Sequence, residues 1–139
     1  MADISVITAG IITPMDLIGQ GRQHTVKAGE AIVAGAPVYL DATTGLYLNS
    51  DANGAGKDIV DGIASRTVAA GEALTIYVVA ILDGYDLSGL NYRAPVYLSN
   101  TVGRLSDSAG GTSIIIGRVY PVYATNLGVA PDKLLEVRL

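Results

Sequence analysis

The single histidine of the chain, His24, is the first residue to consider for catalysis or metal binding. There is no cysteine, which excludes thiol catalysis and thiolate-bound metal. One histidine without a second histidine or a cysteine cannot complete a usual tetrahedral zinc site. A Ser-His-Asp triad would need the same residue, and no Gly-x-Ser-x-Gly turn is present to hold the serine. We therefore expect His24 to be structural and the protein not to be an enzyme.

A glycine-rich segment around Lys57 is the next candidate, because glycine-rich loops with a lysine cradle phosphate groups. It reads Gly-Ala-Gly-Lys-Asp over residues 54–58. A phosphate-binding loop has the form Gly-x-x-x-x-Gly-Lys followed by Ser or Thr. This chain has Asp51 and Asp58 where the first glycine and the hydroxyl residue belong. Since carboxylates repel phosphate, we predict an ordinary turn.

Acidic side chains could serve a calcium ion or acid-base catalysis. Four oxygen-bearing side chains lie in one segment: Asp51, Asn53, Asp58 and Asp61. Their spacing lacks the regular ligand positions and the closing glutamate of a calcium loop, so we interpret the segment as a solvated loop. Asp83 and Asp86 flank Gly84, and counting residues does not exclude a carboxylate pair that hydrolyses glycosides. Aspartate is common in turns for conformational reasons, and we predict a turn here too.

The eight tyrosines are the only aromatic residues. Aromatic side chains bind single-stranded nucleic acid when basic side chains lie beside them. The nine lysines and arginines are scattered singly and the net charge is −4, so no basic stripe is present to neutralise a phosphate backbone. We expect no direct binding to nucleic acid, and we expect the tyrosines to pack in a sheet or at interfaces.

The composition predicts one domain that works within an assembly. A chain of 139 residues can bury a core without disulfides. Only 16% of its residues are charged, against about 25% in typical proteins, so we expect partner molecules to cover part of its surface. The apolar runs are too short to span a membrane, and the acidic start does not resemble a secretory signal. We expect no membrane association and no cofactor.

The elements that would position these residues are strands. The pentapeptide Ala-Pro-Val-Tyr-Leu occurs at Ala36–Leu40 and again at Ala94–Leu98, and each copy is followed by a glycine, Gly45 or Gly103. This pattern predicts a hairpin turn and a returning strand after each copy. Proline has no N–H to donate, so each copy should begin a strand or lie at an edge. Apolar patterns predict further strands at 59–66, 74–82, 113–120 and 134–139.

The repeat extends beyond the pentapeptide. After each copy of the pentapeptide comes an apolar strand that is interrupted by a glycine, Gly62 in the first half and Gly117 in the second. These two glycines lie 55 positions apart, whereas the pentapeptides lie 58 apart. We interpret this as one supersecondary unit used twice within a single domain, with loops of different length. The sequence thus predicts an all-β domain over residues 25–139, with related halves at about 25–82 and 83–139.

Residues 1–24 have a different character and are predicted to form an N-terminal arm. They are rich in isoleucine, but Pro14 and three glycines leave no clear helical or strand period. One alternative is a strand packed on its own domain. The other is an extended arm buried only against another subunit, because apolar residues without a partner promote aggregation. The candidate residues for this contact are Ile4, Val6, Ile7, Ile11, Ile12, Leu17 and Ile18.

Two segments resemble the decoration, or cement, proteins of tailed-bacteriophage capsids. They are Thr25-Val-Lys-Ala-Gly-Glu-Ala-Ile-Val-Ala-Gly-Ala-Pro-Val-Tyr-Leu and Val60-Asp-Gly-Ile-Ala-Ser-Arg-Thr-Val-Ala-Ala-Gly-Glu-Ala-Leu-Thr-Ile-Tyr. In that family a strand after Ala-Gly is followed by a turn, then Gly-Ile-Ala, then Ala-Gly-Glu and a hydrophobic strand. The resemblance covers about residues 25–82, and the second half is less typical.

The resemblance implies a compact β-barrel-like or β-tulip domain that forms a homotrimer on the capsid exterior. Such proteins bind the major capsid protein at local threefold positions of the mature shell and hold neighbouring capsomers together against internal DNA pressure. The implied location is the virion, after assembly in the host cytoplasm. Two other interpretations stay open: another virion component, such as a head-fibre base or tube subunit, and a small hydrolase or carbohydrate-binding module.

Overall fold

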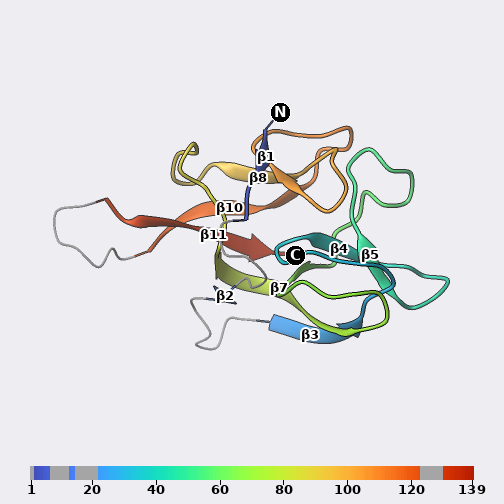
Figure 1. Cartoon of the computed structure of the whole chain (residues 1–139). Helices are drawn as coiled ribbons and strands as arrows, with labels where there is room; N and C mark the ends of the chain where they lie inside the picture. Colours follow the sequence, from blue (N-terminus) through green and yellow to red (C-terminus); the bar gives the residue numbers. More distant parts are fainter. Residues whose placement is uncertain (1, 7–12, 15–21, 123–129) are drawn as a thin grey trace.

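The computed structural model is an all-β domain, which confirms the expected fold class (Figure 1). It describes residues 2–6, 13–14, 22–122 and 130–139. In these ranges no helix is long and apolar enough to cross a membrane. The strands are β1 (Asp3–Ile4), β2 (Thr13–Pro14), β3 (Arg22–Lys27), β4 (Pro37–Leu40), β5 (Tyr47–Asn49), β6 (Gly62–Ala64), β7 (Ala73–Asp83), β8 (Pro95–Leu98), β9 (Leu105–Ser106), β10 (Ile115–Val122) and β11 (Asp132–Arg138).

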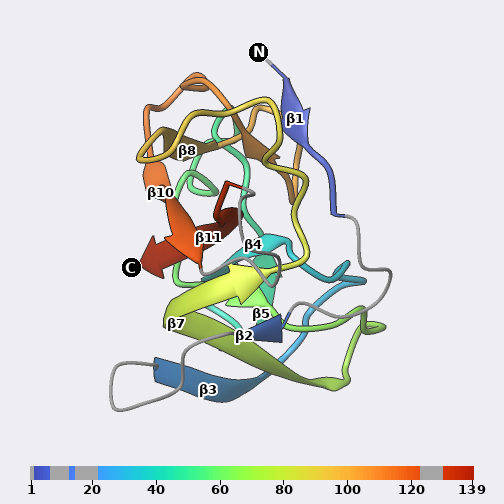
Figure 2. The ribbon, with the colours of Figure 1, turned by 90° about the vertical axis from the view of Figure 1, so that its left-hand side faces the viewer.

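The sheet has the same order of strands on either side of its centre. The order is β1-β9-β8-β10-β11-β7-β6-β4-β5, while β2 and β3 pair with β7. β4 lies between β5 and β6 in one half, and β8 lies between β9 and β10 in the other. β7 and β11 end the two halves and pair with each other at the centre. The sheet curls into a half-barrel, with β8 and β10 in the upper part of Figure 2 and β7 and β3 in the lower part.

The two pentapeptides form β4 and β8, and each strand begins at its proline, as predicted. Leu40 and Leu98 occupy equivalent positions and pair with Tyr47 and Leu105. Both the leucines and their partners are 58 positions apart in the sequence, so the two hairpins have the same register. The sequence repeat is therefore a structural repeat.

The two predicted kinks also occupy equivalent positions. Gly62 pairs with Val38 of the first pentapeptide, and Gly117 pairs with Val96 of the second. Glycine is required at the second kink, because a Cβ atom on Gly117 would lie 1.9 Å from the backbone oxygen of Glu136. No side chain fits there while β10 and β11 stay paired.

β7 is the long central strand and carries partners on both edges. β3 and β6 both pair with Tyr77, so they lie on opposite edges of β7. β2 and β11 both pair with Leu82, again from opposite edges. β2 and β3 therefore run along one edge of β7, whereas β1 pairs with β9.

The core consists of two clusters. The larger contains Ile63 from the first half together with Val96 and Leu135 from the second. The smaller lies within the first half and includes Val38 and Ala64. Ile63 and Ala64 are neighbours in β6, and neighbouring strand residues point to opposite faces. The sheet of the first half is therefore buried on both faces, with the second half covering one of them.

Loops hold the two ends of the curled sheet together. The backbone N–H of Ala52 donates to the oxygen of Ser99 at 3.0 Å, and that of Gly103 donates to Ser50 at 2.8 Å. The N–H of Thr112 donates to the oxygen of Ala52 at 2.9 Å. The loop after β5 is thus fixed against the loops of the second half.

Candidate interaction surface

His24 lies on β3, where its side chain is exposed and its backbone pairs with Ile76. Across the described ranges, no three or more histidine, cysteine, aspartate or glutamate side chains form a group that could hold a metal ion. The position of His24 is that of an ordinary residue on an outer strand.

The acidic loop residues support the backbone of the fold. Asp51 accepts a hydrogen bond from the N–H of Asn53 at 2.9 Å, and Asp61 accepts one from Leu40 at 2.8 Å. Asp58 accepts one from the hydroxyl of Thr112 at 3.0 Å, which joins the two halves. The N–H of Lys57 donates to the oxygen of Gly54, so residues 54–57 form the predicted turn.

Asp83 and Asp86 bond to the backbone next to them. Asp83 accepts a hydrogen bond from the N–H of Gly84 at 2.8 Å. Asp86 accepts bonds from the hydroxyl and the N–H of Ser88, and these bonds lower the pKa of its carboxyl group. The turn lies after the predicted position: Asp83 ends β7, Tyr85 forms a bridge with Val6, and the N–H of Leu90 donates to the oxygen of Leu87.

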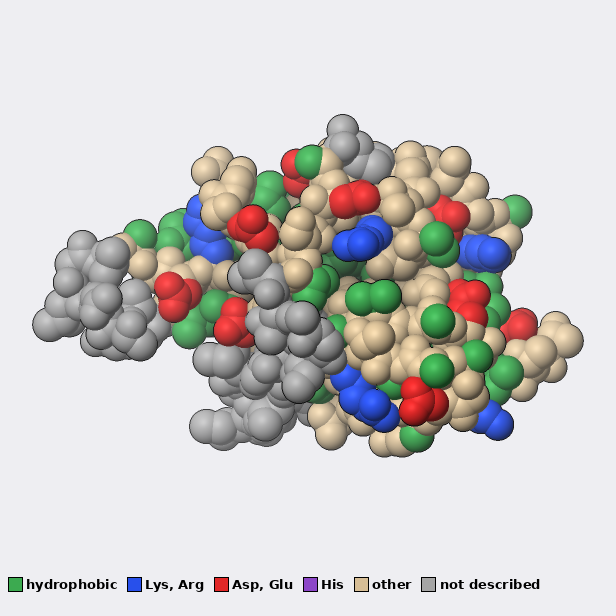
Figure 3. Space-filling model, in the orientation of Figure 1, with side chains coloured by type: hydrophobic (Ala, Val, Ile, Leu, Met, Phe, Trp, Pro, Cys, Tyr) green, Lys and Arg blue, Asp and Glu red, His purple; other side chains and the backbone are tan. Residues whose placement is uncertain are grey.

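Exposed apolar side chains are the most distinctive surface feature. Among the residues that the structure describes, seven large apolar or aromatic side chains are 38% to 57% exposed: Val33, Leu40, Ile59, Tyr92, Val102, Ile115 and Tyr120. On the face shown in Figure 3, hydrophobic side chains are interspersed with acidic and basic ones, and neither sign of charge dominates. Such a mixed surface suits contact with proteins better than attraction to a highly charged polymer.

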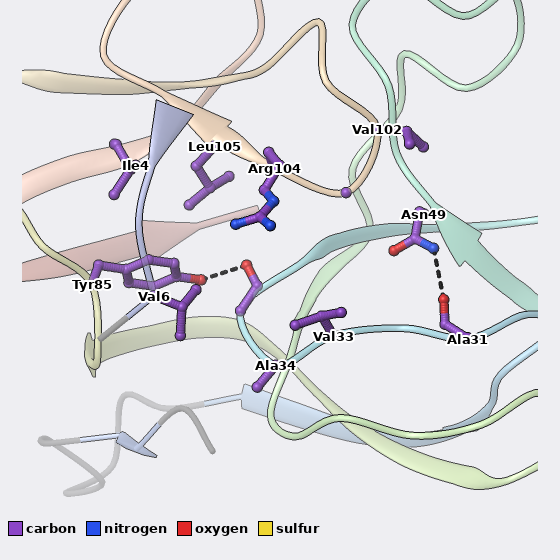
Figure 4. A pocket seen from close by; sticks show the side chains of 12 residues that line it. Ile4, Val6, Ala31, Val33, Ala34, Asn49, Tyr85, Val102, Arg104 and Leu105 are labelled. Carbon is purple, nitrogen blue, oxygen red and sulfur yellow. Dashed lines mark hydrogen bonds between the residues drawn. The ribbon is translucent and has the colours of Figure 1, made fainter. Parts of the chain in front are cut away.

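Two of these side chains, Val33 and Val102, border a pocket between the halves (Figure 4). Its volume is about 180 Å³. The other large apolar side chains that line it are Ile4, Val6, Tyr85 and Leu105. Asn49 and Arg104 supply the polar part of its wall. The pocket forms because the N-terminal strand, the segment before β4 and the turn after β8 meet there.

The pocket is held open by Tyr85, which is buried at 4% exposure. Its hydroxyl donates to the backbone oxygen of Gly35 at 2.7 Å. Burial raises the pKa of this phenol far above its usual value of 10.0, so it stays a neutral donor. The backbones of Val6 and Tyr85 form a bridge on the same wall. The pocket is thus a fixed part of the body.

A second feature is the ribbon of β10 and β11, which extends to the left of the body in Figure 1. Its outer end, where Val122 pairs with Asp132, is fastened to the segment before β8. The hydroxyl of Tyr92 donates to the oxygen of Pro131, and the ammonium of Lys133 donates to the oxygen of Leu90. The same ammonium lies 5.2 Å from the centre of the Tyr92 ring, a cation–π contact.

The structure describes two of the seven predicted arm residues, Ile4 and Val6. Ile4 is 5% exposed and belongs to the larger core cluster, and Val6 is half-buried against the same cluster. β1 pairs with β9, so these two residues pack on their own chain. For them the alternative of a strand packed on its own domain describes the structure. The other five predicted arm residues lie outside the described ranges: Ile7, Ile11, Ile12, Leu17 and Ile18.

Of the residues around the pocket, sequence reasoning singled out Ile4 and Val6, as arm residues, but not Val33, Val102 or Arg104. Val33 lies in a turn region before β4, and Val102 and Arg104 lie in the turn between β8 and β9. A valine in a polar turn is an unusual residue choice and was the one available signal.

No protein-family model matches the chain, and no curated protein is similar enough to count as a match.

Proposed function

We propose that the protein is a structural virion component that decorates the outside of a mature capsid as a homotrimer. On this proposal it binds the major capsid protein at local threefold positions and cements neighbouring capsomers. The observation that carries the proposal is the resemblance of residues 25–40 and 60–77 to capsid decoration proteins. In the fold these two segments pair directly, β4 with β6 and β6 with β7, so they form one structural unit.

Surface features support an assembly role. Large apolar side chains from several loops and strands are exposed on a body whose loops are hydrogen-bonded to one another. A trimer that contacts several capsid subunits at once gains avidity, so each contact needs only modest affinity. Exposed side chains spread over the body suit that mode of binding.

The direct test is decoration of capsids by the purified protein. The 14.3 kDa chain should sediment and scatter light as a trimer. It should also co-sediment with expanded capsids that lack the decoration protein, and raise their resistance to disruption by heat. A monomer that leaves such capsids bare would contradict the proposal.

We propose that the apolar arm residues outside the described ranges make part of the contact with capsid or neighbouring subunits. A variant with serine at Ile7, Ile11, Ile12, Leu17 and Ile18 keeps Ile4 and Val6 in the core. It should unfold at the same urea concentration as the natural chain but lose decoration. A triple variant with serine at Ala42, Ala55 and Ala70 is the control and should keep decoration, because these exposed alanines are not among the large apolar side chains assigned to binding. If the arm variant decorates capsids as well as the natural chain does, the arm does not contribute to capsid binding.

A further inference from the structure

We infer that the pocket between the two halves binds a partner segment that presents an aliphatic side chain beside a carboxylate. The apolar part of this inference follows from size and lining. A pocket of about 180 Å³ is comparable to the apolar cavities of about 150 Å³ that accept a benzene molecule. Ile4, Tyr85 and Leu105 form its buried wall, and Val33 and Val102 form its exposed rim. One branched aliphatic side chain would fill it and cover both valines.

The carboxylate part follows from Arg104. Its side chain points into the pocket in Figure 4, and it is exposed to solvent. Among the described residues, no hydrogen bond or ion pair engages its guanidinium. Elsewhere, the Arg66 guanidinium donates to the oxygen of Ala73, and that of Arg138 lies 3.4 Å from Glu136. A guanidinium beside an apolar pocket binds a planar carboxylate with matched geometry.

Two other polar groups of the pocket are already engaged, the amide nitrogen of Asn49 and the backbone oxygen of Gly35. The amide nitrogen of Asn49 donates to Glu30 at 2.9 Å and to the oxygen of Ala31 at 3.0 Å. The oxygen of Gly35 accepts the Tyr85 hydroxyl. Arg104 therefore supplies the charge that selects the ligand, and the fixed wall keeps the ordering cost of binding low.

This inference rests on the proposed function, since the occupant is a segment of an assembly partner. The chemistry of the pocket can nevertheless be tested without any capsid. N-acetyl-L-leucine carries the aliphatic side chain and the carboxylate, and N-acetyl-L-leucinamide carries the side chain alone. Each is titrated into the full-length, isotope-labelled protein while amide NMR signals are followed.

The acid should shift the signals of Gly35, Val102 and Leu105 at millimolar concentration. The amide should shift the same signals but bind about two- to fivefold more weakly, the range of an exposed ion pair. Raising the salt concentration should reduce this preference, because exposed charges are screened.

Arg104→Gln should abolish the preference for the acid while leaving weak binding of both probes. Arg22→Gln, an exposed arginine on β3, is the matched control and should leave the preference intact.

A second variant tests the same site without removing the arginine. Val102→Asp, at a residue 52% exposed, places a carboxylate beside Arg104 and should weaken the acid more than the amide. Equal binding of both probes to the natural chain would overturn the inference, as would shifts confined to other parts of the body. Shifts of the pocket signals with protein concentration alone would indicate a second copy as occupant and would also overturn it. Failure of capsid decoration would count only against the proposed function.

Discussion

Tyr85 joins the halves of the molecule through one side chain. It belongs to the second half, yet its hydroxyl bonds to Gly35 in the first. Tyr85→Phe removes the donor and leaves a buried carbonyl without its partner, so the free energy of unfolding should fall by about 1–3 kcal/mol in urea denaturation. Tyr97→Phe, at a half-buried residue of β8, should change it by less than about 0.5 kcal/mol. Equal changes in the free energy of unfolding for the two variants would show that the Tyr85 hydrogen bond does not contribute to stability.

The same residue predicts a loss of stability at high pH. Burial holds the pKa of Tyr85 far above 10.0 in the folded protein, while the unfolded chain ionises near that value. Above pH 10 the unfolded state therefore binds fewer protons, and the free energy of unfolding should fall by up to about 1.4 kcal/mol per pH unit. Tyr85→Phe should show a shallower fall between pH 10 and 11. Some slope should remain, because burial also raises the pKa of Tyr39, Tyr47 and Tyr77.

Glycine positions give a graded prediction about backbone contact. Gly117→Ala would force a Cβ atom against the backbone of β11, which cannot move without breaking the sheet, so it should cost more than about 3 kcal/mol. Gly62→Ala should cost less, because its Cβ meets the Ile76 side chain, with Cδ1 at 2.6 Å. Gly89→Ala, which meets no atom within 4 Å, should be nearly neutral in the same urea titration. The opposite order of Gly62 and Gly117 would contradict the close approach described here.

At the scale of elements, local patterns predicted the strands well. β4, β7 and β8 lie where the pentapeptides and the long apolar run place them, because alternation, proline and glycine act on neighbouring residues. The pairing of β1 with β9 had no local signal, since two-residue strands about 100 positions apart carry no period. The burial of Ile4 was missed for the same reason. Whether the Ile4 side chain is buried depends on where distant segments such as β9 lie in the fold.

The pocket could not be predicted because it is made by loops that meet. Val33, Val102 and Arg104 come from two turns whose sequences indicate only that the chain reverses there. Their proximity follows from the curl of the sheet and from hydrogen bonds such as Gly103 to Ser50. Sequence alone identified the unit that is repeated, and the structure showed how two such units enclose a space.

At the scale of the molecule, the repeat raises the question of whether each half can fold alone. The larger core cluster takes Ile63 from one half and Val96 and Leu135 from the other, and β7 pairs with β11 across the boundary. Separating the halves exposes the larger cluster, so each half loses much of the apolar burial that offsets its conformational entropy. Fragments 1–82 and 83–139 should therefore each lack a cooperative urea transition and a near-ultraviolet tyrosine signal. Mixing them in equal amounts should restore both, because the exposed edges of β7 and β11 are complementary. A fragment that unfolds cooperatively alone would mean that the halves are independent modules, and the shared core would then be a contact between two domains.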